Sequence, residues 1–375
     1  MITTINNKHN KLNVPNLRFK EFQGEWEYFL INDVCSEFKS GKNIKADSVF
    51  ECGEYPVYGG NGLRGYTSSY NHEGSYVLIG RQGALCGNVR SVYGKTYITE
   101  HAIAVAGNEK SNTNFLHYLF LKMNLGQYSD QSAQPGLAVN KLLKLKVALP
   151  IISEQTKIAK FLSLLDERIA TQSKIIDKLQ SLIKGIVDST ILRKEKNAIV
   201  GDVCSISEQI RAEANIDDII TVRLHGNGVC KSSAENLQLG ATQYYRRRAG
   251  QLIYGKQNFH NGAIGIVPIS LDNGITSKDI PSFDIDEMKC NSVYLLAQLQ
   301  SPQYYKPAEA LTTGTGSKRL KEETFLKMPI VLPNKREQDN IATLIISISA
   351  NLDQAKKMLD LFSIQKQYLL RQMFI

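Results

Sequence analysis

The stretch ALPIISEQTKIA (Ala148–Ala159) occurs in a second version, VLPNKREQDNIA (Val331–Ala342), farther along the chain. Each version has an apolar residue, Leu-Pro, three variable residues, Glu-Gln, two variable residues and Ile-Ala. Further residues match at the same offset along the chain, without a gap, which indicates a duplication. These matches are Leu143-Lys144 with Leu326-Lys327, Lys174 with Lys357, and Asp177 with Asp360.

A second repeated sequence lies nearer the start of each copy. The sequence DVCS occurs at Asp33–Ser36 and again at Asp202–Ser205, at a shorter offset, so the second copy has more sequence in its middle. We therefore predict two copies of one unit. Each copy consists of a variable globular segment, a Leu-Pro hinge and a Glu-Gln segment.

The Glu-Gln segments are predicted to be long helices, because their apolar residues recur at the alternating steps of four and three that define a heptad stripe. Leu-Pro suits a helix start, since proline is tolerated in a first turn, and Ser153 is a candidate N-cap. In the second copy Lys366 interrupts the stripe before Leu369 resumes it. The stripe residues are Ile158, Leu162, Leu165, Ile169, Ile176, Leu179, Ile183 and Ile186 in the first copy, and Ile341, Ile345, Ile348, Leu352, Ala355, Leu359 and Phe362 in the second.

Each helix of about 40 residues would be roughly 60 Å long. Packing of each helix on its own globular segment is an alternative, but a stripe of this length would overhang a segment whose radius of gyration is about 14 Å. We expect the two helices to pair with each other. The link Arg193–Asn197 spans at most about 17 Å, so the second globular segment starts near the far end of the first helix, which favours an antiparallel pair.

The predicted fold class is therefore α+β, with two mixed α/β domains, each followed by a long helix, an antiparallel coiled coil and an internal pseudo-twofold duplication. The predicted bounds are 1–150 for the first domain, 151–196 for the first helix, 197–333 for the second domain and 334–375 for the second helix.

Composition narrows the function classes. The 375 residues are 42% hydrophobic and 22% charged, which suits two or three folded domains, and the net charge of +9 suggests a polyanionic partner such as nucleic acid. The polar first residues and the lack of a long apolar run predict no signal peptide and no membrane span, hence a cytoplasmic protein. The spacing of the six cysteines predicts no zinc site.

Both globular segments are predicted to contain strands joined by glycine turns and one helix, at Asn112–Leu125 and at Asn291–Gln300. Polar residues near the glycines are of the types that contact bases and phosphates. Each of them alone also fits a solvated basic turn, and only their clustering in both copies indicates an interface. The DNA-binding candidates are Asn61, Arg64, Arg81, Gln82, Asn88 and Arg90 in the first copy, and His225, Asn227, Arg246, Arg247, Arg248, Lys256, Gln257, Asn258, Lys318 and Arg319 in the second.

Catalytic motifs are not found. The stretch Gly87–Thr96 lacks the spacing of a phosphate-binding loop, and there is neither an Asn-Pro-Pro-aromatic motif nor a G-x-S-x-G motif. His101 beside Glu100 fits a structural histidine better than an acid–base pair. We predict no catalytic residue, no metal and no cofactor on this chain.

Four stretches resemble the specificity subunits of Type I restriction–modification systems: Val14–Trp26, Tyr55–Tyr66, Gln134–Pro150 and the EQTKIA sequence. The resemblance covers nearly the whole chain, although the second copy departs from it in places. It implies that each globular segment is a target-recognition domain that reads half of a bipartite, asymmetric site in double-stranded DNA. It also implies that the helices dock two methyltransferase subunits, joined by restriction–translocase subunits, and that S-adenosylmethionine, ATP and magnesium bind only to those partners.

Two alternatives remain at this point. The chain could be a nuclease or methyltransferase fused to its own reader, which the missing motifs disfavour. It could also be a coiled-coil scaffold with two ligand-binding domains that do not bind DNA.

Overall fold

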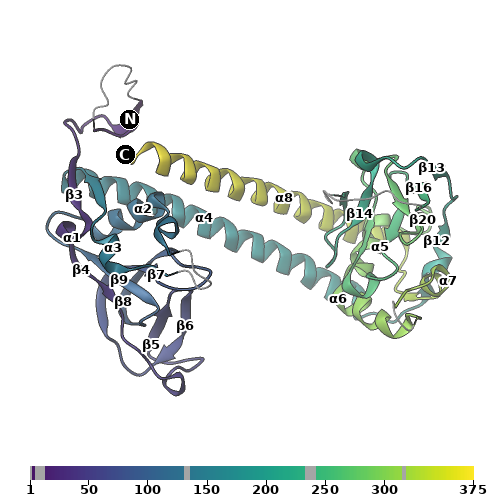
Figure 1. The fold of residues 1–375 in the computed structure, drawn as a ribbon. Coiled ribbons are helices and arrows are strands. Elements are labelled where there is room, and N and C mark those ends of the chain that lie inside the picture. Colours follow the sequence, from purple (N-terminus) through teal and green to yellow (C-terminus); the bar gives the residue numbers. More distant parts are fainter. Residues whose placement is uncertain (1, 5–12, 131–135, 233–241, 315–317) are drawn as a thin grey trace. The chain divides into compact units, whose positions relative to one another are not determined.

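The computed structural model describes residues 2–4, 13–130, 136–232, 242–314 and 318–375. The chain forms two compact units (Figure 1). Unit 1 consists of Met1–Ser173 and Lys357–Ile375, and unit 2 of Lys174–Lys356. Each unit therefore contains one globular segment, part of one long helix and part of the other. The predicted domain bounds follow the sequence rather than these units and stay a prediction.

Unit 1 is built on a six-stranded sheet with the order β4-β9-β7-β8-β5-β6. β5 and β8 are parallel, and the other neighbours are antiparallel. Helix α2 (Thr113–Met123) packs on the sheet with Phe115, Leu116, Leu119 and Phe120 buried. The strands are β4 (Cys35–Ser40), β5 (Tyr55–Gly59), β6 (Gly62–Thr67), β7 (His72–Gly80), β8 (Val89–Ile98) and β9 (Ala102–Gly107).

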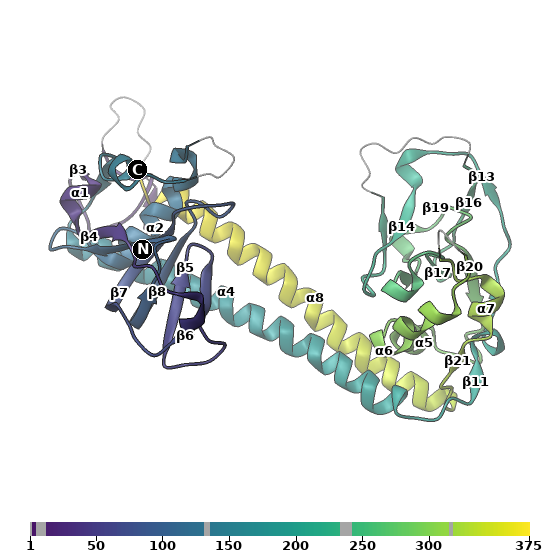
Figure 2. The same cartoon turned by 60° about the horizontal axis from the view of Figure 1, so that its bottom comes forward.

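Unit 2 repeats the first four strands of this order as β12-β20-β17-β18, and Figure 2 labels the two central strands, β17 and β20. Helix α5 (Ser292–Leu299) corresponds to α2. The strands shorten to three or four residues, and the unit adds a three-stranded sheet, β13-β16-β19, and the pair β14-β15. Their bounds are β12 (Cys204–Ile206), β13 (Arg211–Ala212), β14 (Ile220–Val222), β15 (Val229–Lys231), β16 (Tyr244–Arg246), β17 (Leu252–Tyr254), β18 (Ile264–Ile266), β19 (Ile275–Ser277) and β20 (Ser282–Ile285).

Each globular segment is closed by a strand just before the Leu-Pro hinge. In unit 1, β10 (Lys146–Leu149) pairs with β3 (Glu27–Leu30), and in unit 2, β21 (Pro329–Ile330) pairs with β11 (Ala198–Ile199). The duplicated frame and the mixed α/β character predicted from the sequence are thus confirmed. The remaining strands and short α-helices are β1 (Ile2–Thr4), β2 (Leu17–Phe19), α1 (Ile31–Val34), α3 (Val139–Leu142), α6 (Pro302–Tyr305) and α7 (Glu322–Leu326).

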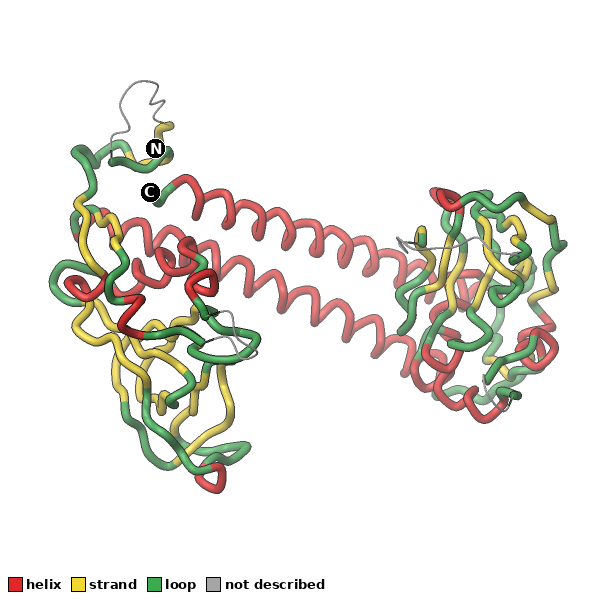
Figure 3. Tube along the Cα trace, viewed as in Figure 1, coloured by secondary structure: helices red, strands yellow, loops and turns green. Residues whose placement is uncertain are grey.

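The long helices are α4 (Ile152–Val187), which continues into a π-helical turn at Asp188–Leu192, and α8 (Lys335–Gln372) (Figure 3). Every predicted stripe residue is buried or half-buried, which confirms the heptad pattern. None of the described helices is long and apolar enough to cross a membrane.

Within each unit the two helix segments are antiparallel. In unit 1, Leu162 and Leu165 of α4 share a core with Leu369 of α8, and Phe362 packs against it. In unit 2, Val187 and Ile191 share a core with Ile341 and Ile345. The predicted cap was wrong: Ser153 is exposed inside the first turn, and the Ile151 carbonyl accepts the amides of Glu154 and Gln155 instead.

The end of each long helix completes the core of a globular segment. In unit 1 the buried Phe374, just after α8, has its ring 5.1 Å from that of Phe115 in α2 and 6.4 Å from that of Trp26. Ile191 corresponds to Phe374 at the offset of the duplication, and it is buried in the core of unit 2. Each core therefore includes residues from the other copy's helix.

Candidate nucleic-acid interface

The tripeptides Gly80-Arg81-Gln82 and Gly255-Lys256-Gln257 lie at equivalent places in the two units. The Arg81 amide donates to the His101 carbonyl, and its carbonyl accepts the Leu137 amide, both at 2.9 Å. The Lys256 amide donates to the Asp279 carbonyl, and its carbonyl accepts the Leu320 amide, also at 2.9 Å. Leu137 and Leu320 correspond at the offset of the two Glu-Gln segments, so the duplication extends to the backbone pairing at this turn.

In unit 1 the turn between β5 and β6 lies beside this tripeptide. A Cβ atom on Gly60 would be 2.7 Å from the His101 carbonyl oxygen and 3.6 Å from the Arg81 nitrogen, so the turn requires glycine there. Cβ atoms on Gly59 and Gly62 would be 2.8 Å from the Arg64 Cδ and 3.2 Å from the Arg90 Cζ. The turn thus gathers Arg64, Arg81 and Arg90 at one end of the sheet.

The exposure of the candidates in unit 1 suits an interface. Asn61, Arg64, Gln82 and Arg90 are exposed, while Arg81 and Asn88 are half-buried. Among the described residues, none of the three arginines forms an ion pair with a carboxylate. Their charges are therefore available to a phosphate backbone. The six candidates of the first copy remain a prediction as DNA contacts.

In unit 2 the charges next to the equivalent turn are paired. Lys256 is half-buried and bonds to Glu322 at 2.6 Å. Lys318 bonds to Glu309 at 2.8 Å and lowers the pKa of that carboxyl, and Arg319 lies 3.4 Å from Asp279. The last two pairs are exposed and so contribute little to stability, which leaves Lys318 and Arg319 able to exchange their carboxylates for phosphates.

The other candidates near this turn are Gln257, Asn258, His225 and Asn227, all exposed. The amide of His225, in the left-handed conformation at φ 60°, donates to the carbonyl of Asn261, whose side chain bonds to Asn258. His225 therefore lies near the turn, as Asn61 does in unit 1. It also lines an apolar groove of 470 Å³ formed by α4, α5 and α8 within unit 2.

Arg247 is a correction, because its side chain is fully buried and cannot reach DNA. Its guanidinium donates to Thr276 Oγ1 at 2.7 Å, Ser282 Oγ at 2.8 Å and the Ile280 carbonyl at 2.9 Å. Burial lowers the pKa of Arg247 to about 10, so it stays charged at neutral pH. Arg246 and Arg248, on either side, are exposed and remain candidates.

The Glu-Gln dipeptide of each copy lies at the junction between long helix and globular segment. Glu154 is fully buried, and both carboxylate oxygens accept bonds from Arg18, at 2.8 and 2.7 Å. Glu337 is half-exposed and pairs with Lys194. The two glutamates thus differ. Glu154 connects the N-terminal segment to α4 through Arg18, whereas Glu337 forms an ion pair at the surface.

The glutamines make the same three contacts in both copies. Gln155 Oε1 accepts the Asn112 amide at 2.8 Å, and its Nε2 donates to the carbonyls of Pro150 and Lys110 at 2.8 and 2.9 Å. Gln338 Oε1 accepts the Asn291 amide at 2.9 Å. Its Nε2 donates to the carbonyls of Pro333 and Lys289, at 2.8 and 3.1 Å.

Sequence reasoning missed the role of these glutamines, although a signal was present. Gln155 and Gln338 lie one stripe step before Ile158 and Ile341, the first positions of the two heptad stripes. Extending each stripe by one step backwards predicts a buried side chain at the glutamine. Both are buried, at 0% and 1% exposure.

One polar group interrupts the helix pair in unit 1. Lys366, at the interrupted stripe position, lies 2.5 Å from Asp166 of α4, which also accepts the Tyr118 hydroxyl at 2.8 Å. Burial, then the charge of Lys366, lowers the pKa of the adjacent His117 to about 4. The duplication places Ser349 and Ile183 at the equivalent positions of unit 2, so this polar group occurs in one copy only.

The helix surfaces also expose large apolar side chains. In unit 1 a groove of 600 Å³ lies between α4 and α8, lined by residues including Phe161, Leu164 and Phe362. Surface apolar residues concentrated on two helices indicate a protein-binding surface. The exposed apolar residues are Ile152, Leu164, Met358, Leu361, Ile364 and Tyr368 in unit 1, and Ile175, Leu182, Leu344 and Ile346 in unit 2.

Across the described residues, no group of three or more His, Cys, Asp or Glu side chains could hold a metal ion.

Comparison with known proteins gives consistent matches. Residues 23–181 match the family model described as Type I restriction modification DNA specificity domain. The chain is 42% identical over 204 residues to the Type I restriction enzyme EcoprrI specificity subunit of Escherichia coli, covering 52% of this chain and 47% of that one. It thus spans about half the length of that relative. It is 23% identical to the MjaVIII specificity subunit of Methanocaldococcus jannaschii, over 90% of each chain.

The fold has a solved counterpart. The crystal structure of a Type I restriction–modification system S subunit from M. genitalium aligns with a TM-score of 0.71 at 14% identity, over 96% of this chain and 99% of that one. At this identity the likeness shows a shared fold.

Proposed function

We propose that this chain, which belongs to the family of Type I restriction–modification specificity proteins, is the non-catalytic subunit that reads a bipartite, asymmetric site in double-stranded DNA. Each globular segment reads one half-site. Methylation, ATP use and cleavage belong to two methyltransferase subunits and to restriction–translocase subunits, which hold S-adenosylmethionine, ATP and magnesium. The complex acts in the cytoplasm.

One observation carries the proposal: both copies place polar residues at an equivalent turn, while the residues themselves differ. The frame around Arg81 and Lys256 has the same backbone pairing. Within the described residues, the cations next to it lack carboxylate partners in unit 1 and are ion-paired in unit 2. A shared frame with different contacts is what two readers of different half-sites require.

The helix surfaces support the partner assignment. The exposed apolar residues of α4 and α8 lie on segments of both units, as two copies of a docking subunit need. Charge at the globular segments and apolar surface on the helices therefore suit different partners, DNA for the first and protein for the second.

The test exchanges one reader. Residues Asn197–Pro333 are replaced by the corresponding segment of a relative, the chain is produced with its methyltransferase, and the methylated sites are mapped across a genome. We expect one half-site to change and the other to persist. A change in both half-sites, or in neither, contradicts the two-reader model.

A second function, a scaffold that binds no DNA, rests on the same apolar helix surfaces. Binding of the assembled complex to duplex DNA separates the two. A reader with several phosphate contacts loses about 10³–10⁵ in affinity between roughly 50 and 200 mM salt. Binding that does not respond to salt favours the scaffold.

A further inference from the structure

Gln155 and Gln338 lie at the junction between each globular segment and its long helix. Both are buried, and both bind the same three backbone groups. Both donor hydrogens of each amide are used and its oxygen accepts one bond, and at 0% and 1% exposure neither side chain can be reached by an external ligand. The role of the two glutamines is therefore internal to the protein.

The hydrogen bonds continue from the glutamine into the globular segment. The residue that donates its amide to the glutamine, Asn112 in unit 1 and Asn291 in unit 2, is the N-cap of α2 or α5. Asn112 Oδ1 accepts the amides of Asn114 and Phe115, and Asn291 Oδ1 accepts those of Val293 and Tyr294. The long helix is thus joined, through one glutamine and one asparagine, to the helix that packs on each sheet.

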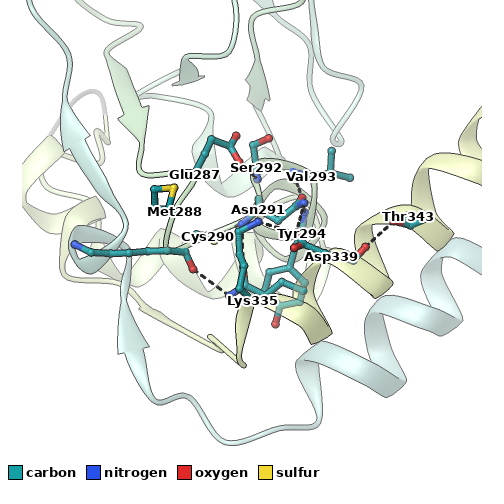
Figure 4. Close-up of polar contacts among 12 residues, drawn as sticks. Glu287, Met288, Cys290, Asn291, Ser292, Val293, Tyr294, Lys335, Asp339 and Thr343 are labelled. Carbon is teal, nitrogen blue, oxygen red and sulfur yellow. Dashed lines mark hydrogen bonds and ion pairs between the residues drawn. The ribbon is translucent and has the colours of Figure 1, made fainter.

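A second link runs beside the first. Asn291 Nδ2 donates to Asp339 Oδ1 at 2.8 Å, and Asn112 Nδ2 donates to Thr156 Oγ1 at 3.3 Å. Figure 4 shows Asn291 at the start of α5 close to Asp339 of α8, and Lys335 bonds to the same carboxylate. Hydrogen bonds from Lys335 and Asn291 lower the pKa of Asp339, so the acceptor is ionised at neutral pH.

The geometry of these bonds restricts rotation as well as separation. Each glutamine contacts the proline carbonyl of the hinge, a carbonyl of the loop before α2 or α5, and the amide of the cap residue. Three contacts from one planar group fix the loop in direction relative to the helix axis. Rotating the globular segment on its helix would leave buried amide and carbonyl groups unpaired, which is costly.

From this we infer that Gln155 and Gln338 are positioning residues that hold each reader at a fixed angle on its helix and so set the spacer length between the two half-sites. The inference rests on the proposed function. α4 begins in one unit and ends in the other, so a change of angle at either junction changes the distance between the bases that the two readers reach.

The experiment uses the complex of the full chain with its methyltransferase. The substrates are duplex DNAs with the two half-sites mapped for the wild type, separated by the wild-type spacer or by one base pair more or less. The variants are Gln155→Met and Gln338→Met, which keep the volume and remove the hydrogen bonds. Ser153→Ala and Arg336→Ala, exposed residues just before the two glutamines, are the matched controls.

For both methionine variants we expect the preference for the wild-type spacer to fall by about tenfold, with the half-site sequences unchanged. A tenfold change corresponds to about the free energy that one buried hydrogen bond contributes. The controls keep the wild-type preference. An unchanged preference in the methionine variants overturns the inference, and so does an equal loss of half-site discrimination, which indicates general misfolding.

A pair of variants that keeps one of the three hydrogen bonds decides the case if the methionine variants do not assemble. Gln155→Glu and Gln338→Glu keep the acceptor for the asparagine amide and place a carboxylate oxygen against two carbonyls. A loosened spacer preference in these variants supports the inference, and a wild-type preference overturns it. Failure of the proposed function gives a different result, since the wild-type complex then shows no dependence on one of the half-sites.

Discussion

Replacing Phe374 by alanine is predicted to destabilise unit 1, although Phe374 lies near the other end of the chain from most of that unit. The side chain is 3% exposed and its ring contacts Phe115 and Trp26. Truncating a buried phenylalanine to alanine costs about 3–5 kcal/mol through lost burial and the cavity left behind. That is a large fraction of the roughly 5–15 kcal/mol that stabilises a typical domain.

The chain has one tryptophan, Trp26, so its fluorescence reports the unfolding of unit 1 alone. With a urea m-value of about 2–3 kcal/mol/M, the loss moves the midpoint down by about 1–2 M. Tyr368→Ala is the matched control, since it removes an aromatic ring from the last turns of α8, close to Phe374 in the sequence, at a position that is 56% exposed. It should leave the midpoint within about 0.3 M.

Two results refute the reasoning. A shift below about 0.5 M for Phe374→Ala means that the end of α8 does not belong to the core of unit 1. An equal shift for Tyr368→Ala means that the loss comes from the helix in general rather than from the buried contact.

Three further predictions follow from single residues. Arg247→Ala removes the guanidinium that satisfies Thr276, Ser282 and the Ile280 carbonyl, and should cost about 2–4 kcal/mol in chemical unfolding, whereas Arg248→Ala should change stability by less than about 0.5 kcal/mol. Burial lowers the pKa of His117 to about 4 from an ordinary value of 6.5. At pH values between these two pKa values, the unfolded chain therefore binds more protons than the folded chain does. Stability should be fully present above about pH 6.5 and fall by about 2–3 kcal/mol towards pH 4, and His117→Leu should remove this dependence in thermal unfolding at a series of pH values. Arg64→Ala should weaken binding of the assembled complex to its DNA by about tenfold and reduce the salt slope by about one, and an unchanged slope would place Arg64 outside the interface.

Much of the frame was predictable from the sequence, because it depends on local periodicity and on repetition. The heptad stripe of Ile158 and Leu162 appears in the sequence as steps of four and three, and the structure buries both. The helices predicted at Asn112–Leu125 and Asn291–Gln300 are present with slightly shorter bounds, and the duplication reappears in the hydrogen bonds of Leu137 and Leu320.

Features that depend on distant residues were not predictable. The run Tyr244–Arg248 looks like the densest cationic stretch, but burial of Arg247 depends on Thr276 and Ser282, which come much later in the chain. The apolar stretch Tyr97–Gly107 reads in the sequence as one strand, but it contains the end of β8 and the whole of β9, with a turn at Glu100-His101 between them. The contact of Phe374 with Trp26 joins residues near opposite ends of the sequence, and no local sequence pattern predicts it.

The discontinuous make-up of unit 1 has a consequence for synthesis on the ribosome. Unit 2 is one continuous segment, so all its parts are available as soon as Lys356 has emerged. Unit 1 cannot complete its core at that point, because Leu369, Met373 and Phe374 belong to this core and are translated only after the whole of unit 2. At about 5–20 residues per second, the roughly 200 residues between Ser173 and Phe374 take on the order of 10–40 s to translate. The segment of the chain that is made first is therefore the last to complete its core.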